Sequence, residues 1–282
     1  MNKAHFKRYV NTKDFLVSGE SFDLLYDTKR EILLTSPQPK KEQLASYYES
    51  EDYISHTDTD KGIVSYLYQA VKRYSLKSKL RLISSLNKGS GNLLDIGAGT
   101  GEFLKLAKDN GWNVDGVEPN EKARTLADEK KIILKSDLDG FSGEQFDVVT
   151  LWHVLEHLPD LEEAIQKIEG LVKPGGVLII AVPNFKSYDA KHYKNFWAAY
   201  DVPRHLWHFS RKSMQFLFSE KMKLQKIKPM VFDSFYVSLL SEKYKTGNSF
   251  SLKAFWVGLL SNITALRTKE YSSLIYCFKK HK

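Results

Sequence analysis

Cysteine is almost absent from this chain, which contains one residue, Cys277, among 282. A single thiol excludes an intrachain disulfide and any zinc site built from several cysteines, and it suits a reducing compartment. Long apolar runs are also missing: the longest have about seven residues, against the roughly 20 that a membrane-spanning helix needs. The N-terminal residues lack the apolar stretch of a signal peptide. We therefore expect a cytoplasmic protein with no membrane span.

No internal repeat or low-complexity segment occurs either, which excludes a solenoid or a biased linker protein. The content of 42% hydrophobic and 13% aromatic residues allows a sizeable buried core and excludes a disordered chain. The length suits one large α/β domain with a smaller appended segment.

The net charge of +8 is unevenly distributed. Residues 1–90 contain 15 basic and 11 acidic residues, residues 91–183 contain 9 and 17, and residues 184–282 contain 18 and 6. An acidic middle segment is thus flanked by basic segments. This distribution is compatible with ordinary solvated surfaces, and it also suits an anionic substrate or surface beside the middle segment.

The stretch 92–101, with the sequence NLLDIGAGTG, organises the rest of the chain. An apolar run containing Asp95 leads into Gly97, Ala98, Gly99 and, after one further residue, Gly101, and an amphipathic stretch follows at once. This order predicts a buried strand, a tight turn and a helix start, the opening unit of a nucleotide-binding α/β sheet. Glycine suits the turn because it tolerates a positive φ and leaves the backbone open to a ligand.

The spacing of this turn separates two classes of cofactor. A dinucleotide-binding turn has a third glycine where this chain has Glu102, and a carboxylate at the start of the following helix would repel a pyrophosphate. S-adenosylmethionine (SAM) has no phosphate and carries a positive sulfonium, so acids such as Asp95 and Glu102 are compatible with it. The spacing favours SAM over a nicotinamide dinucleotide.

Further polar residues follow the next two predicted strands. Glu118, which precedes Pro119, ends the second strand 23 residues after Asp95. A carboxylate there can accept hydrogen bonds from both hydroxyl groups of a ribose. Asp137 and Leu138 follow the third strand and offer an acid and an apolar side chain where an adenine would lie. The sequence therefore predicts a nucleoside site at the ends of these strands.

Strands and helices alternate regularly around these motifs. The expected strands cover 92–96, 113–117, 132–134, 146–151 and 177–182, and the expected helices cover 62–86, 101–110, 120–130 and 161–171. Alternation at these lengths predicts a parallel sheet with helices on both faces. Between residues 71 and 90 there are six basic and no acidic residues, which predicts one strongly positive helix face.

The flanking segments have a different rhythm. Short strands are expected at 22–26 and 32–35, a helix at 41–50, an aromatic, histidine-rich insertion at 184–211, helices at 211–221, 234–244 and 251–266, and a final strand pair at 224–230 and 273–278. We divide the chain into an N-terminal hairpin and lid region (1–60), a core (61–233) that contains the insertion, and a helical cap with the final strand (234–282). Tyr47, Tyr48, Tyr53 and His56 lead us to expect that 45–60 closes over the cofactor as a lid.

The chain resembles the class I SAM-dependent methyltransferases, and among them the bacterial group that includes ubiquinone-type and sugar methyltransferases. The resemblance covers roughly residues 60–230 and is carried by Asp95–Gly101, Glu118, Asp137, the run FDVVTLWHVLEHL at 146–158 and the KPGG turn at 173–176. It implies a Rossmann-like sheet of seven strands, mostly parallel, with an antiparallel last strand.

The same resemblance assigns parts of the cofactor to residues. It implies that Asp95 and the three glycines hold the methionine moiety, and that Trp152 and His153 lie beside it. Some relatives carry an N-terminal zinc knuckle of paired cysteines, whereas the hairpin expected at 22–35 has none and would be held by packing. The C-terminal helical insertion is another departure, so the resemblance does not identify the substrate.

Methyl transfer requires a nucleophile held in line with the methyl group and, for an O–H or N–H nucleophile, a base that takes the proton. Our candidate catalytic residues are His153 and His157, four residues apart, and Arg204 and His205 in the cluster YDVPRHLWHF at 200–209. A single histidine is more often structural. We assign no metal ligands; the alternative, implied by likeness to some quinone methyltransferases, is a divalent ion held by His153, Glu156 and His157.

The acceptor is expected to be an anionic small molecule or glycan precursor, bound between the insertion and the strand 146–151. Arg204 offers a planar fork for a carboxylate or phosphate, and Trp197 and Trp207 can cover a ring-shaped body. In the alternative interpretation Arg204 only pairs with Asp201 and fixes the loop. A nucleic acid is less favoured, because basic and aromatic residues are not spread along a stripe.

Two other functions remain open from the sequence. The chain could be a SAM-binding protein without catalysis, which the polar residues near the expected methyl position argue against. It could also be a nicotinamide-dependent oxidoreductase, which Glu102 disfavours. The preferred interpretation is a SAM-dependent methyltransferase.

Overall fold

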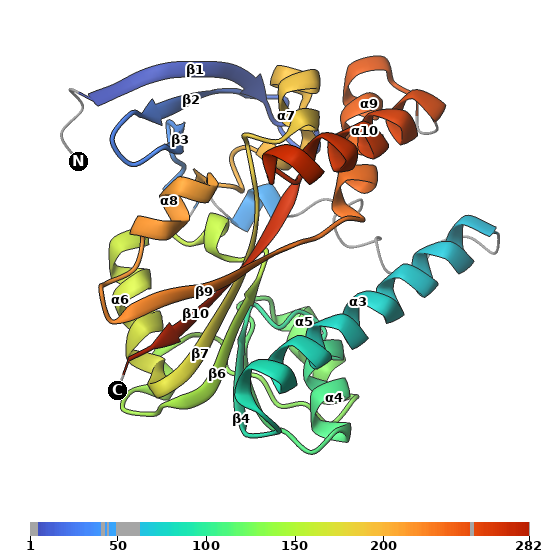
Figure 1. The fold of residues 1–282 in the computed structure, drawn as a ribbon. Helices are drawn as coiled ribbons and strands as arrows, with labels where there is room; N and C mark the ends of the chain where they lie inside the picture. Colours follow the sequence, from blue (N-terminus) through green and yellow to red (C-terminus); the bar gives the residue numbers. More distant parts are fainter. Residues whose placement is uncertain (1–4, 41–42, 44, 49–62, 249–250, 282) are drawn as a thin grey trace.

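The computed structural model describes residues 5–40, 43, 45–48, 63–248 and 251–281. Two sheets organise them, a larger one flanked by helices and a smaller antiparallel one that lies beside the C-terminal helices (Figure 1). The first strand of the chain belongs to the smaller sheet, whereas the last strand lies within the larger one. In the described part of the chain, no helix combines the length and the apolar character needed to cross a bilayer.

The larger sheet has six strands in the order β5-β4-β6-β7-β10-β9. Their bounds are β4 Asn92–Ile96, β5 Asn113–Val117, β6 Phe146–Trp152, β7 Val172–Pro183, β9 Met222–Pro229 and β10 Ser273–Lys280. The first four strands are parallel, and β10 runs antiparallel to both β7 and β9. The predicted mostly parallel sheet with an antiparallel last strand is therefore confirmed.

The expected seventh strand, at 132–134, is not formed. The chain there makes an isolated parallel bridge between Val117 and Lys135, with one hydrogen bond on each side of it. Ile133 points into solvent with 83% of its surface exposed. A run of three apolar residues at the sheet edge buries too little surface to sustain a ladder, so six strands replace the predicted seven.

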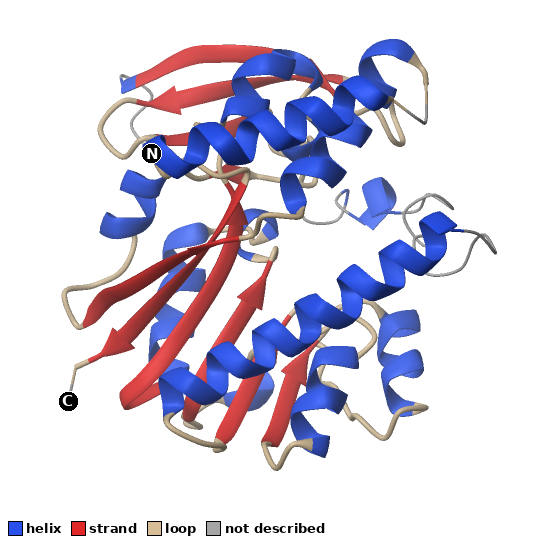
Figure 2. Cartoon of the chain, turned by 45° about the vertical axis from the view of Figure 1, so that its right-hand side comes forward, coloured by secondary structure: helices blue, strands red, loops and turns tan. Residues whose placement is uncertain are grey.

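Helices cover both faces of this sheet, and the alternation of strand side chains explains how. Their bounds are α3 Ile63–Asn87, α4 Glu102–Asp109, α5 Glu121–Asp128 and α6 Leu161–Leu171. Leu93, Val148 and Ile179 are buried with residues of α3 and α4. Their neighbours Leu94, Val149 and Ile180 belong to the opposite cluster, with residues of α6. Figure 2 shows α3 lying diagonally across its face of the sheet.

The smaller sheet has the order β1-β2-β3-β8. Its strands are β1 Phe6–Lys13, β2 Ser21–Asp27, β3 Ile32–Ser36 and β8 Trp207–His208. The predicted hairpin corresponds to β2 and β3, which pair antiparallel. The sequence did not indicate β1 or β8. β8 comes from the histidine-rich insertion and pairs with β3 through Leu33 and Leu34, so the insertion belongs to the same layer as the N-terminus.

A second hydrophobic core lies beneath the smaller sheet. Leu24 and Leu33 pack there with Trp197, Tyr200 and other aromatic residues of the insertion. The surrounding elements are η2 Ala45–Tyr48, α7 Tyr188–Tyr193, η6 Lys194–Phe196, η7 Ala198–Tyr200, α9 Asp233–Thr246 and α10 Leu252–Thr268. The helix α8, Arg211–Phe216, instead buries Met214 in the main core. The carboxyl ends of the parallel strands point toward this layer (Figure 2), and ligands of such sheets bind at that edge.

Candidate active site

The glycine turn joins β4 to α4 and is tied to the neighbouring strand. Val117 at the end of β5 accepts hydrogen bonds from the backbone N–H groups of Gly97 and Ala98, at 2.7 and 2.9 Å. Gly97, Gly99 and Gly101 all adopt positive φ, at 71°, 54° and 73°. Residues other than glycine rarely adopt such φ angles, so the glycine pattern of the sequence agrees with the backbone conformation of the turn.

Two of these glycines also differ in the space around them. A Cβ atom at Gly97 would lie 2.4 Å from Val154, so this glycine allows the turn to pack against the end of β6. A Cβ atom at Gly99 would meet no described atom within 4 Å. The backbone at Gly99 is therefore open to a ligand, as a close approach requires.

Glu118 lies directly beside this open backbone. Its Oε2 accepts a hydrogen bond from the Gly99 N–H at 2.9 Å, and its Oε1 accepts one from the Asn120 N–H at 2.9 Å. The guanidinium of Arg124 donates to the carbonyls of Glu118 and Pro119 and holds the strand end in place. A carboxylate has about four lone-pair directions, so Glu118 can keep both bonds and still accept hydroxyl groups.

Asp95 is buried below the turn, with 2% of its surface exposed. Thr150 on β6 donates its hydroxyl proton to Asp95 Oδ1 at 2.6 Å. Burial raises the pKa of Asp95 to about 7, although the Thr150 hydrogen bond and the charge of Lys79 act in the opposite direction. The raised pKa of the Asp95 carboxyl group therefore lies close to neutral pH. Its hydrogen bond to Thr150 connects the end of β4 to the adjacent strand β6.

Asp137 and Leu138 follow the bridge to Val117, at the same edge of the sheet as Glu118. Asp137 is exposed, and hydrogen bonds, first that from Ser136, lower the pKa of its carboxyl group. Leu138 is half-buried and packs against the main core. The structure thus brings this pair and the ribose candidate to one edge, as the sequence predicted from separate motifs.

Trp152 ends β6 and is half-buried. Its ring meets Phe103 edge-on at 5.8 Å, and the Lys79 ammonium lies 4.4 Å from its centroid. Burial lowers the pKa of Lys79. Within the described part of the chain the buried Trp152 Nε1 has no acceptor. Lys79 was missed as a site residue, although it belongs to the basic helix face that the sequence indicated.

His153 follows in the left-handed region, with φ 59°. Its Nδ1 lies 3.3 Å from Glu156 Oε1 and its Nε2 lies 3.2 Å from Asp233 Oδ2. Burial opposes a charged imidazole, but the two carboxylates outweigh it and raise the pKa of His153 to about 10. This geometry does not favour His153 as a general base, because a protonated ring cannot accept a proton. No motif in the sequence indicated Asp233.

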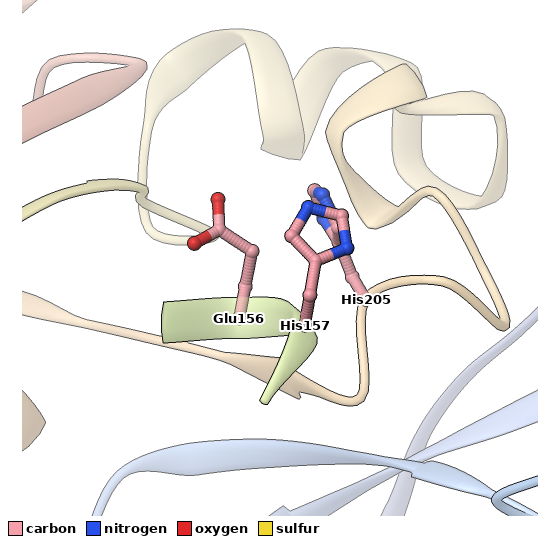
Figure 3. Close-up of side chains that lie close together, drawn as sticks. All are labelled: Glu156, His157 and His205. Atoms are coloured by element: carbon pink, nitrogen blue, oxygen red, sulfur yellow. The ribbon is translucent and has the colours of Figure 1, made fainter. Parts of the chain in front are cut away.

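Glu156 also belongs to a second group of ionisable side chains, which Figure 3 shows. Glu156 and His157, on η5 (Leu155–His157), and His205 each place one ligand atom within 4.8 Å of the other two. Burial lowers the pKa of His205, which is therefore neutral. The pKa of Glu156 is also lowered, because the bond and charge of His153 outweigh the effect of burial. The possible metal-binding set contains His205 in place of the His153 of the alternative interpretation.

Hydrogen bonds to backbone carbonyls can set the tautomer of both rings. His205 Nδ1 lies 2.9 Å from the Ala199 carbonyl, and His157 Nδ1 lies 3.1 Å from the Arg204 carbonyl. When each Nδ1 donates to its carbonyl, each Nε2 keeps a lone pair. Glu156 Oε2 is buried and unpaired among the described residues. These atoms can take a proton, or together bind a divalent ion.

Arg204 does not offer a free fork to an acceptor. Its guanidinium is 1% exposed and pairs with Asp14 at 2.9 Å and Asp201 at 2.7 Å. A third donor bonds to the Tyr47 carbonyl at 3.0 Å. The two carboxylates outweigh burial and hold the pKa of Arg204 above its usual range. The structure therefore supports the alternative interpretation, in which Arg204 pairs with Asp201, and adds Asp14, which the sequence did not indicate.

The two tryptophans expected to cover the acceptor are core residues. Trp197 is 2% exposed and donates Nε1–H to Asp189 at 2.7 Å. Trp207 is also buried and donates to the Leu158 carbonyl at 2.9 Å. The aromatic insertion therefore contributes Trp197 to the second core and Trp207 to the main core, while His205 adjoins the site.

The described part of the expected lid reaches the same edge. Tyr48 in η2 places its hydroxyl 3.0 Å from His157 Nδ1. Tyr47 donates its hydroxyl to Glu20 at 2.6 Å, which raises the pKa of Tyr47 to about 12. The remainder of the expected lid, including Tyr53 and His56, lies outside the described residues.

Comparisons with known proteins agree with this geometry. A family model described as a methyltransferase domain matches residues 68–221, more than half of the chain. The ubiquinone biosynthesis O-methyltransferase of Actinobacillus pleuropneumoniae is 32% identical over 131 residues, which cover 40% of this chain and 56% of that protein. An uncharacterized methyltransferase of Geobacillus kaustophilus is 32% identical over 119 residues, which cover 39% and 55%. The chain spans about half the length of these curated relatives.

Solved structures share the fold at low sequence identity. The plantazolicin methyltransferase BpumL, in complex with SAH (S-adenosyl-L-homocysteine), aligns with a TM-score of 0.52 at 16% identity, covering 85% of this chain and 94% of that one. The N-methyltransferase NodS from Bradyrhizobium japonicum, also with SAH, aligns with a TM-score of 0.51 at 16% identity, covering 86% and 98%. The chain belongs to the methyltransferase-domain family and has its Rossmann-like fold.

Proposed function

We propose that this protein is a SAM-dependent methyltransferase. The observation that carries the proposal is the open backbone at Gly99 with the Glu118 carboxylate 2.9 Å from its N–H. In a member of this family, such a turn suits an adenosine without phosphate. We assign the methionine moiety to Asp95, Gly97, Ala98, Gly99 and Gly101, the ribose to Glu118 with Pro119, the adenine to Asp137 and Leu138, and the methionine end to Trp152 and His153.

SAM supplies an electrophilic methyl group: the sulfur–methyl bond breaks as the acceptor forms its bond to carbon, and the electron pair remains on sulfur. The protein must hold the acceptor in line and remove a proton from an O–H or N–H nucleophile. We assign the base role to His157 Nε2. This ring is half-exposed, unlike His205, and when its Nδ1 donates to the Arg204 carbonyl its Nε2 keeps a lone pair.

The acceptor is proposed to be an anionic small molecule or glycan precursor. The support is electrostatic: the insertion and the cap, residues 184–220 and 231–272, contain 11 basic and 6 acidic residues. Arg204 has no part in this proposal because its donors are used within the protein. The related ubiquinone biosynthesis enzymes favour an oxygen nucleophile as the methylated atom.

SAH release from SAM in the presence of fractionated cell extracts tests the activity, and a gain of one methyl group in the mass of a metabolite identifies the acceptor.

His157→Asn should reduce turnover by roughly 10²–10⁴-fold, the usual contribution of a general base, with SAH binding intact. His281→Asn, at an exposed histidine near the C-terminus, is the matched control. Unchanged turnover would refute the base assignment, and loss of turnover on chelation, restored by a divalent ion, would assign the three side chains to a metal instead.

A further inference from the structure

Helix α10 carries large apolar side chains on its outer side. Six of them are exposed and constitute what we call the apolar face of α10: Leu252, Phe255, Trp256, Leu260, Ile263 and Leu266. Apart from the adjacent Phe255 and Trp256, they follow one another at steps of three or four residues, which places them along one side of the helix over about 21 Å. Leu252 is 69% exposed and Trp256 is 59% exposed. Contiguous apolar surface of this kind marks an interaction site.

The opposite side of α10 is fully used by the fold. Ala254, Val257, Gly258, Ser261 and Ala265 are buried, and the helix contacts α9 and α7. Figure 2 shows α10 at the front of the cap, with its length running across the molecule. The apolar face is therefore an outer surface of an otherwise packed helix.

This face is joined to the start of α9, and through it to the candidate site. The rings of Phe255 and Phe235 lie 5.3 Å apart, and Asn262 Nδ2 donates to the Val231 carbonyl at 2.8 Å. The exposed Phe232 precedes the residue whose carboxylate lies 3.2 Å from His153. The apolar face of α10 thus packs beside α9, whose first residue contacts the candidate site.

The charges around the apolar face have one sign. α10 contains Lys253 and Arg267 and no acidic residue, and residues 231–272, which leave out the strand β10, contain five basic and three acidic residues. Each of the three acids has a partner inside the fold: Asp233 contacts His153, Glu242 is buried against Lys253, and Glu270 accepts a bond from Asn184. The outer surface is therefore apolar and positive.

We propose that the apolar face of α10 docks the protein peripherally on an anionic lipid surface. Apolar side chains with tryptophan among them enter the headgroup boundary, while flanking Lys and Arg attract acidic lipids. A second copy of the chain fits less well. In an isologous contact the same patch meets itself, so Arg267 would meet a positive surface with no carboxylate on α10 to pair with it. Docking is independent of the proposed methyl transfer and can be measured without SAM.

Co-sedimentation of the full chain with vesicles tests this proposal. We expect binding to mixed phosphatidylcholine–phosphatidylglycerol vesicles, much weaker binding to phosphatidylcholine alone, and a loss of binding at high salt because of screening. Of the chain's five tryptophans, Trp256 is exposed and the other four are buried or half-buried. Its fluorescence should therefore shift to the blue on binding. The double variant Trp256→Gln/Leu266→Gln should bind at least tenfold more weakly.

Phe216→Gln is the matched control, because Phe216 is 74% exposed but belongs to α8 and not to the apolar face of α10. It should bind vesicles as the wild type does. The proposal is overturned if neither vesicle type binds, or if the control loses binding to the same extent. It is also overturned if sedimentation velocity shows that the wild type is a dimer and the double variant a monomer, while the wild type does not bind vesicles.

Discussion

At the scale of single residues, Glu118 is the side chain on which the cofactor proposal depends most. Its two oxygens accept hydrogen bonds from backbone N–H groups of two loops, at Gly99 and Asn120. The carboxylate is thereby oriented before any ligand arrives, and it lies beside the open backbone at Gly99. Preorganisation of this kind reduces the cost of binding.

Glu118→Ala should weaken SAM binding by tenfold or more, because it removes hydrogen bonds to a charged acceptor that are worth about 1.5–3 kcal/mol each. Calorimetric titration measures the change. Glu121→Ala is the control, since Glu121 lies three residues further on, is exposed, and belongs to the first turn of α5. Equal affinities for Glu118→Ala and wild type would show that the ribose is bound elsewhere.

The raised pKa of His153 predicts how the stability of the folded protein depends on pH. Its pKa is raised from an ordinary 6.5 to about 10 by Asp233 and Glu156, so the folded protein binds this proton more tightly than the unfolded chain. Its contribution to stability is therefore complete below about pH 6.5 and is lost as the pH rises toward 10.

The measurement is the melting temperature of wild type and His153→Asn across this pH range; asparagine is chosen because it tolerates a positive φ. The wild type should exceed the variant most at the acidic end, with the difference shrinking toward the alkaline end. A difference that stays constant, or that grows with pH, would contradict the assignment of a charged imidazole.

At the scale of elements, Arg204 joins segments that are far apart in sequence. It connects Asp14, in the loop before β2, with Asp201 after η7 and with the carbonyl of Tyr47 in η2. The buried cluster therefore fixes the N-terminal layer to the insertion whose His205 adjoins the site. A buried ion pair is costly to break from one side because it leaves unpaired charge.

Arg204→Met should lower the free energy of unfolding by about 3–5 kcal/mol, measured by urea denaturation. Arg211→Met, at a half-buried arginine 4.0 Å from Glu270, should cost less than about 1 kcal/mol. If Arg204→Met left stability unchanged and instead raised the KM for the acceptor, Arg204 would be an acceptor-binding residue after all.

The elements also show how far sequence reasoning reaches. The strands 92–96 and 113–117 and the helix 161–171 were predicted with their observed bounds, because local periodicity and glycine signals define them. β1 and β8 were missed, since β1 is a polar edge strand and β8 has two residues that pair with a distant segment.

The candidate site divides in the same way. The glycine turn and Glu118 follow from local motifs, and the structure brings them together. Lys79, Asp14 and Asp233 act on residues far along the chain, and local patterns do not encode such contacts. The protonation of His153 and the burial of Arg204 depend on these partners, so the roles expected for both could not be judged from the sequence.

At the scale of the whole molecule, the two layers meet at the carboxyl edge of the larger sheet. The turn, Glu118 and the end of β6 come from the larger layer, whereas His205, Tyr48 and Asp233 come from the smaller layer and its cap. A ligand at this edge would contact both layers, so its binding should stabilise the molecule as a unit.

The melting temperature with SAH, compared with that in the presence of NAD, tests the central claim most directly. At a hundredfold excess over its Kd, SAH should stabilise the protein by about 2.7 kcal/mol, while NAD, whose pyrophosphate would meet Glu102 at the start of α4, should leave the melting temperature unchanged. Stabilisation by NAD with none by SAH would contradict the assignment of this chain as a SAM-dependent methyltransferase.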